Sequence, residues 1–180
     1  MTSQTLWYLT RSTGIVAMVL LTGTMVLGVL TTGRFATRSW PRFAWQDLHR
    51  RVSLLAVIFL GLHIATTVAD GYVPIGWVSA IVPFTSSYRR LWLGLGTLAV
   101  DMLLAVGVSS LVRSHIRARS WRALHWLAYL CWPLAVAHGI GIGTDAGTGW
   151  VLVVVASCVA AVVGSVAWRL RPFRPASVGS

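Results

Sequence analysis

The stretch HRRVSLLAVIFLGLH, residues 49–63, begins and ends with histidine and is apolar through most of its interior. A second stretch, HWLAYLCWPLAVAH, residues 125–138, has the same form. The histidines are 14 residues apart in the first stretch and 13 in the second. At a rise of about 1.5 Å per residue, each spacing corresponds to about 20 Å along a helix, which fits within a hydrocarbon layer about 30 Å thick. Each stretch therefore predicts a membrane-crossing helix with one histidine toward each face.

The rest of the chain has the composition of a membrane protein. Of its 180 residues, 56% are hydrophobic and 11% are charged, whereas a soluble domain has about 25% charged residues. The net charge of +11 does not indicate nucleic-acid binding, because the arginines cluster at the ends of apolar runs. Cys131 and Cys158 lack the spacing of a metal site, so we expect free packing residues.

Five apolar runs are long enough to cross a bilayer, which predicts an all-α bundle of five transmembrane helices forming a single domain over residues 1–180. The predicted spans are Thr13–Thr32, His49–Ala69, Leu91–Val112, Trp121–Ile142 and Gly149–Leu170. Residues 71–90 contain a further apolar stretch that is too short to cross. We expect an interfacial segment there on the outer face, and a sixth span if it were counted as crossing.

Arginine counts predict the orientation. Five arginines follow the first span, four follow the third and three follow the start of the last turn of the fifth, against three on the opposite side. Because positively charged loops stay in the cytoplasm, we expect the N-terminus outside and the C-terminus in the cytoplasm, in a multi-pass protein of a bacterial plasma membrane. In this topology His49 and His125 form an inner pair, and His63 and His138 form an outer pair.

Two helices with matched histidines can present facing imidazoles at two depths, the arrangement that holds two haems. On an ideal helix His49 and His63 point within about 40° of each other, whereas His125 and His138 diverge by about 140°, so we expect a distortion near Pro133. Zinc is a poor alternative because its ligands must lie about 2 Å from one ion. Bis-imidazole haem favours electron transfer, and no catalytic residue is predicted.

Other residues are candidates for supporting roles. Trp132 lies midway along its span and is a candidate bridge between the haems. Arginines near each pair are candidate partners of haem propionates, and each is also explained as a topology signal. These arginines are Arg50, Arg51 and Arg122 near the inner pair and Arg89 and Arg90 near the outer pair. Asp101, in the middle of the third span, is either a proton relay or a structural carboxyl with Thr97 as partner.

The pattern of H-x13-H on one span and H-x12-H two spans later resembles the ferric reductase-like transmembrane domain. Its superfamily includes NADPH oxidases, metalloreductases and the haem subunit of periplasmic methionine sulfoxide reductases. The resemblance covers residues 49–139, with His49, His63, His125 and His138 as the matching residues. It implies a cytochrome with two b-type haems and outward electron transfer. Family cores often have six spans, where five are predicted here.

The larger members of this family carry a flavin and nicotinamide module, which the chain lacks, because no glycine-rich loop follows a strand. We therefore expect an oxidoreductase component with a separate donor, either a flavoprotein, another reductase or a quinol. The expected acceptor is extracytoplasmic, such as ferric iron, oxygen or a partner protein. Two alternatives stay open: the membrane subunit of an extracytoplasmic reductase such as methionine sulfoxide reductase, and a non-redox scaffold or sensor with structural histidines.

Overall fold

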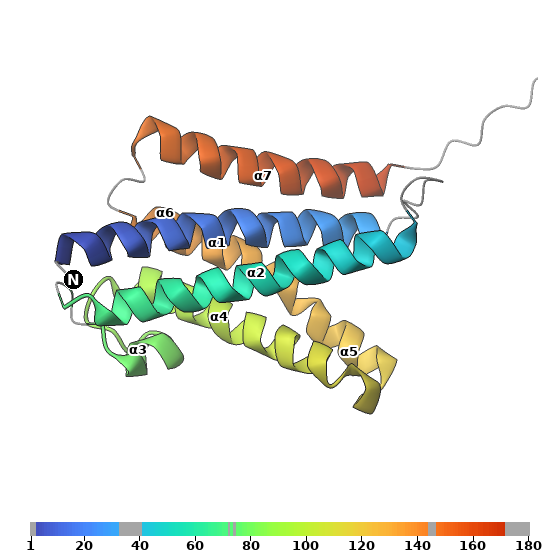
Figure 1. Ribbon diagram of the computed structural model, residues 1–180, viewed down its shortest axis with the longest axis horizontal. Coiled ribbons are helices and arrows are strands. Elements are labelled where there is room, and N and C mark those ends of the chain that lie inside the picture. Colours follow the sequence, from blue (N-terminus) through green and yellow to red (C-terminus); the bar gives the residue numbers. More distant parts are fainter. Residues whose placement is uncertain (1–2, 33–40, 72, 74, 144–146, 172–180) are drawn as a thin grey trace, which may run out of the picture.

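The computed structural model describes residues 3–32, 41–71, 73, 75–143 and 147–171. Its elements are α1 (Ser3–Thr32), α2 (Arg42–Ala69), α3 (Trp77–Ile81), α4 (Arg90–Leu111), the 3-10 turn η1 (Arg113–His115), α5 (Ala118–His125), α6 (Leu127–Ile142) and α7 (Gly149–Leu170). No strand occurs in this part of the chain, so the predicted all-α fold is confirmed (Figure 1).

Five helical segments among the described residues are long and apolar enough to cross a membrane, which confirms the predicted number. They are α1, α2, α4, α5 together with α6, and α7. Two of them begin earlier than predicted, at Ser3 rather than Thr13 and at Arg42 rather than His49. The backbone hydrogen bonds of a helix continue past the point where the apolar run ends. The chain is thus built as a multi-pass membrane protein.

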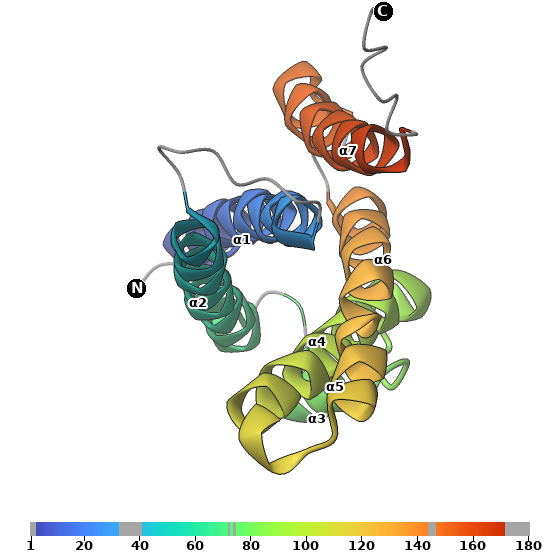
Figure 2. The same cartoon turned by 90° about the vertical axis from the view of Figure 1, so that its right-hand side faces the viewer.

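The spans form two close pairs, α1 along α2 and α4 along α6, and α1 also contacts α6 and α7. Seen end-on, α1, α2, α4 and α6 surround the bundle axis and α7 stands at the periphery (Figure 2). A buried core lies where α1, α6 and α7 meet, formed by Met25, Trp132, Val136, Cys158 and Val162. Large apolar side chains remain exposed on the outside of the helices, as expected for contact with lipid.

The fourth span is interrupted at Trp126, between α5 and α6. The Trp126 N–H donates to the carbonyls of both Arg122 and Ala123, which indicates a tightened turn. In contrast, α6 runs through Pro133 without a break. The distortion that was expected near Pro133 therefore lies seven residues earlier, and it changes the direction of the segment that carries His125.

The segment between α2 and α4 contains only the short helix α3, so it adds no sixth span. Residues 72 and 74 of this segment lie outside the described part of the chain. Phe84 has a left-handed backbone, with φ of 64°, and its ring packs where a Cβ on Gly94 would lie. The Thr97 hydroxyl donates to the carbonyl of Ser79 over 2.7 Å. These contacts fasten the segment to the N-terminal half of α4.

Candidate functional site

The four intramembrane histidines meet in the two predicted pairs. The ring centroids of His63 on α2 and His138 on α6 are 6.4 Å apart, with an interplanar angle of 82°. The centroids of His49 on α2 and His125 on α5 are also 6.4 Å apart, with an angle of 61°. The interruption at Trp126 accompanies this alignment, since an unbroken helix would aim His125 and His138 apart.

The separation within each pair matches the spacing of two axial ligands on one metal ion. An imidazole nitrogen binds a metal at about 2.0 Å. In a five-membered ring with bonds of about 1.33 Å, a nitrogen lies about 1.1 Å from the centroid. Two imidazoles on opposite sides of one ion therefore place their centroids about 6.2 Å apart. The observed 6.4 Å in both pairs is close to this value.

Backbone carbonyls hold the second nitrogen, Nδ1, of three of these histidines. A carbonyl only accepts, so each of these Nδ1 atoms carries the proton and donates it. The bonds join His49 to Thr24 over 3.1 Å, His63 to Thr10 over 2.9 Å and His138 to Trp92 over 2.8 Å. Metal-bound histidines commonly donate their other N–H in this way, which fixes the tautomer and leaves Nε2 free as the ligand.

Each of the three accepting carbonyls is followed four residues later by a glycine. The pairs are Thr10 with Gly14, Thr24 with Gly28, and Trp92 with Gly96. Side chains of a helix lean toward its N-terminus, so a residue at this position would cover the carbonyl one turn before it. Glycine leaves that carbonyl open to an imidazole from the neighbouring helix.

The distances confirm how closely the rings approach these glycines. A Cβ on Gly14 would lie 2.9 Å from Nδ1 of His63, and a Cβ on Gly96 would overlap the ring of His138. Sequence reasoning missed these glycines. The available signal was the repeat of T-x3-G in α1 at an interval of 14 residues, the same interval that separates the histidines of α2.

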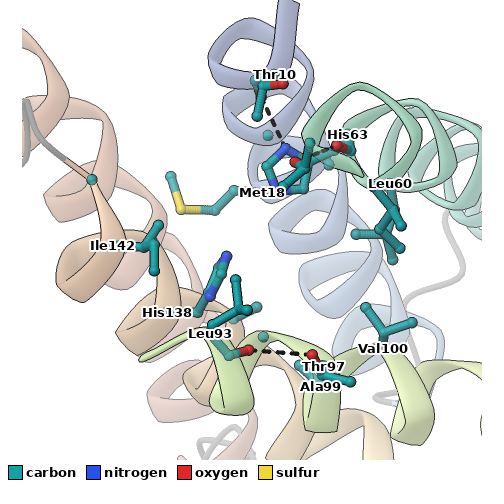
Figure 3. A pocket seen from close by; sticks show the side chains of 18 of the residues that line it. Thr10, Met18, Leu60, His63, Leu93, Thr97, Ala99, Val100, His138 and Ile142 are labelled. Carbon is teal, nitrogen blue, oxygen red and sulfur yellow. Dashed lines mark hydrogen bonds between the residues drawn. The ribbon is translucent and has the colours of Figure 1, made fainter. Parts of the chain in front are cut away.

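A cavity of about 370 Å³ surrounds the His63–His138 pair. Figure 3 shows both imidazoles projecting into it, with Met18, Leu60 and Val100 on its walls. The walls are mainly apolar and come from α1, α2, α4 and α6. At the end nearest the start of α1, the lining includes Trp7, Arg11, Asp70 and Tyr88. The site is therefore a dry slot between two imidazoles with polar groups at one mouth.

The arginines predicted to meet propionates have other partners or stand exposed. Arg89 donates to the carbonyl of Gly141, and Nε of Arg90 donates to that of Phe84. Arg51 pairs with Asp47 over 2.6 Å, an exposed ion pair contributing at most about 1 kcal/mol. Arg50 and Arg122 are exposed near the His49–His125 pair.

Arg11, which sequence reasoning had read only as a flanking charge, lines the cavity itself. Its guanidinium carbon lies 4.7 Å from the ring centroid of Trp7. Because it lies at the polar mouth of the slot, Arg11 is a better candidate for an anionic group of a bound cofactor than Arg89 or Arg90.

Trp132 is absent from the cavity lining and lies in the core between α1, α6 and α7. Its indole N–H donates to the hydroxyl of Thr22 over 3.0 Å. This position favours a packing role, and the bridging role stays a prediction.

Asp101 is half-buried in the middle of α4. The expectation that Thr97 is its partner is wrong, because the single hydroxyl proton of Thr97 is directed to backbone carbonyls, with Ser79 the nearest at 2.7 Å. The functional role of Asp101 stays a prediction.

Among the described residues, no group of three or more histidine, cysteine or acidic side chains could hold a metal ion. A haem needs only two protein ligands, since the porphyrin supplies the other four. Comparison of the chain with protein-family models, with curated proteins and with solved structures finds no match. The two histidine pairs therefore carry the functional inference.

Proposed function

We propose that the chain is a transmembrane di-haem b cytochrome, of the ferric reductase-like kind, that moves electrons from a cytoplasmic or quinol donor to an extracytoplasmic acceptor. The observation that carries the proposal is the 6.4 Å separation of the imidazoles in both pairs. His63 and His138 would hold the outer haem, and His49 and His125 the inner one. Two imidazoles at that separation leave room for one metal ion between them, at two depths in one bundle.

Haem held by two imidazoles supplies reversible one-electron chemistry at an iron whose axial positions are both filled. The chain provides the position and the surroundings. The carbonyls of Thr10, Thr24 and Trp92 orient three of the ligands. The apolar walls around the outer pair exclude water, and Arg11 is placed to form a charge-assisted hydrogen bond with a propionate.

The spacing of the pairs suits transfer across a membrane. The 14 residues between His49 and His63 span about 21 Å of helix, most of a hydrocarbon layer about 30 Å thick. With the arginine-rich loops in the cytoplasm, outward electron movement is favoured by an inside-negative potential, by about 2.3 kcal/mol per charge per 100 mV. The donor is a separate flavoprotein or a quinol, because the sequence contains no dinucleotide-binding loop.

Haem stoichiometry of histidine variants tests the pairing. We expect His63→Ala and His138→Ala each to lose the same haem and to keep one per chain, and the double variant to keep that one as well. His49→Ala and His125→Ala should each lose the other haem. His115→Ala is the matched control, because His115 is exposed in η1, and it should keep both.

Two results would contradict the proposal: a wild-type protein without haem, or losses that do not follow the pairs. Co-purification of an extracytoplasmic subunit would identify the acceptor as a partner reductase.

A further inference from the structure

His125 differs from the other three ligands in what holds it. Its Nδ1 is buried and has no hydrogen-bond partner among the described residues. If the register that sets Trp92 opposite His138 continued, the carbonyl of Ala105 would face His125. Four residues further on, α4 carries the buried Ser109 in place of a glycine. The turn at Trp126 also takes α5 out of that register.

An aromatic ring takes the place of the missing carbonyl. Trp121 lies one helical turn before His125 on α5, and the two rings are stacked, with centroids 4.9 Å apart and an interplanar angle of 27°. The guanidinium carbon of Arg113, from η1, lies 4.3 Å from the centroid of Trp121. The three side chains form one continuous stack, Arg113–Trp121–His125, at the arginine-rich end of the bundle.

We propose that Trp121, itself held by Arg113, is the positioning residue of His125, and that stacking does for this ligand what a backbone carbonyl does for the other three. The inference rests on the proposed function, because it concerns the ligand of the inner haem. A hydrogen bond from Nδ1 raises the basicity of a metal-bound imidazole. His125 lacks that bond, so it donates less charge to iron than His49, His63 or His138. This difference favours the ferrous state of the inner haem relative to the outer one.

The test uses variants of Trp121 in the full chain. His138→Ala, which removes the outer haem, isolates the inner haem for measurement. Trp121→Leu abolishes the stack, Trp121→Phe keeps an aromatic ring, and Trp126→Leu is the matched control on the same span. Trp126 is 62% exposed and its ring packs on Tyr129 rather than on a histidine.

Two readouts report on the inner ligand directly: the rate at which the inner haem is lost to excess apomyoglobin, and its low-spin ferric EPR signal. We expect Trp121→Leu to speed haem loss about 10- to 100-fold, the usual effect of removing a group that orients a metal ligand, and to shift the EPR signal. Trp121→Phe should restore both readouts, and Trp126→Leu should match the parent.

Arg113→Gln removes only an exposed guanidinium, so it provides a variant that folds even if Trp121→Leu does not. It should shift the EPR signal in the same direction by a smaller amount. Unchanged readouts in Trp121→Leu and Arg113→Gln, or an equal change at the outer haem of the otherwise wild-type chain, would overturn the positioning role alone. A wild-type protein that binds no haem would overturn the proposed function instead.

Discussion

Gly96 is the position at which the proposed site should tolerate a side chain least. A Cβ there would lie 2.7 Å from Cε1 and 2.8 Å from Cγ of His138, and closer still to Nδ1. Ordinary contact begins at 3.4 Å, so Gly96→Ala forces the ring to move by about 0.7 Å at Cε1, the difference between 3.4 Å and 2.7 Å. The ring is also tied to the Trp92 carbonyl, and both constraints cannot be satisfied together.

The expected cost follows from the bond that is lost. The bond from His138 to Trp92 is 2.8 Å long, and the displacement takes it beyond the usual limit of about 3.2 Å. Removing a group that orients a metal ligand weakens binding about 10- to 100-fold, or about 1.4 to 2.8 kcal/mol. Alanine is also a better helix former than glycine by about 1 kcal/mol, so unfolding of α4 would not explain a loss.

The assay is the rate of outer-haem loss to excess apomyoglobin, together with haem content on purification. Gly107→Ala is the matched control on the same helix, because a Cβ there meets nothing within 4 Å. Gly96→Ala should lose the outer haem about 10 to 100 times faster, Gly14→Ala less so with its contact at 2.9 Å, and Gly28→Ala hardly at all with its contact at 3.5 Å. Wild-type retention in Gly96→Ala, or a fast loss in Gly107→Ala, would refute the reasoning.

Three further substitutions separate the roles of nearby residues. Trp132→Phe should lower the free energy of unfolding by about 0.5 to 1.5 kcal/mol through the loss of one hydrogen bond, and leave the inter-haem electron-transfer rate unchanged in flash photolysis; slower transfer would support the bridging role. Arg11→Gln should speed loss of the outer haem alone, whereas Arg90→Gln should lower thermal stability without selecting a haem; equal effects on the outer haem would count against Arg11. Asp101→Asn should keep both haems, and a slowed proton uptake on reduction would assign it a relay role.

The sequence predicted the helices and the pairing because both depend on regular spacing. An apolar run of about 20 residues and a histidine repeat near whole helical turns are local patterns, readable without knowing how helices pack. The groups that orient the ligands are backbone carbonyls, which have no residue identity. Thr10, Thr24 and Trp92 therefore look ordinary in the sequence, and only the glycines four residues later mark them.

Other features depend on tertiary packing, which spacing does not determine. The turn at Trp126 carries no proline or glycine, so the visible Pro133 drew the expected distortion to the wrong place. Trp132 is midway along its span, as predicted, but its direction around the helix is set by the contact with Thr22 and the core. The stack on His125 depends on Arg113, which reaches Trp121 from beyond the start of α5.

The most direct test of the central claim is the number of haems bound per purified wild-type chain, measured by pyridine haemochrome against protein concentration after expression with ample haem supply. Two b-type haems per chain, with the reduced α-band of low-spin bis-imidazole iron, are expected. A colourless protein, or a single haem that survives replacement of the histidines of either pair, would contradict the account.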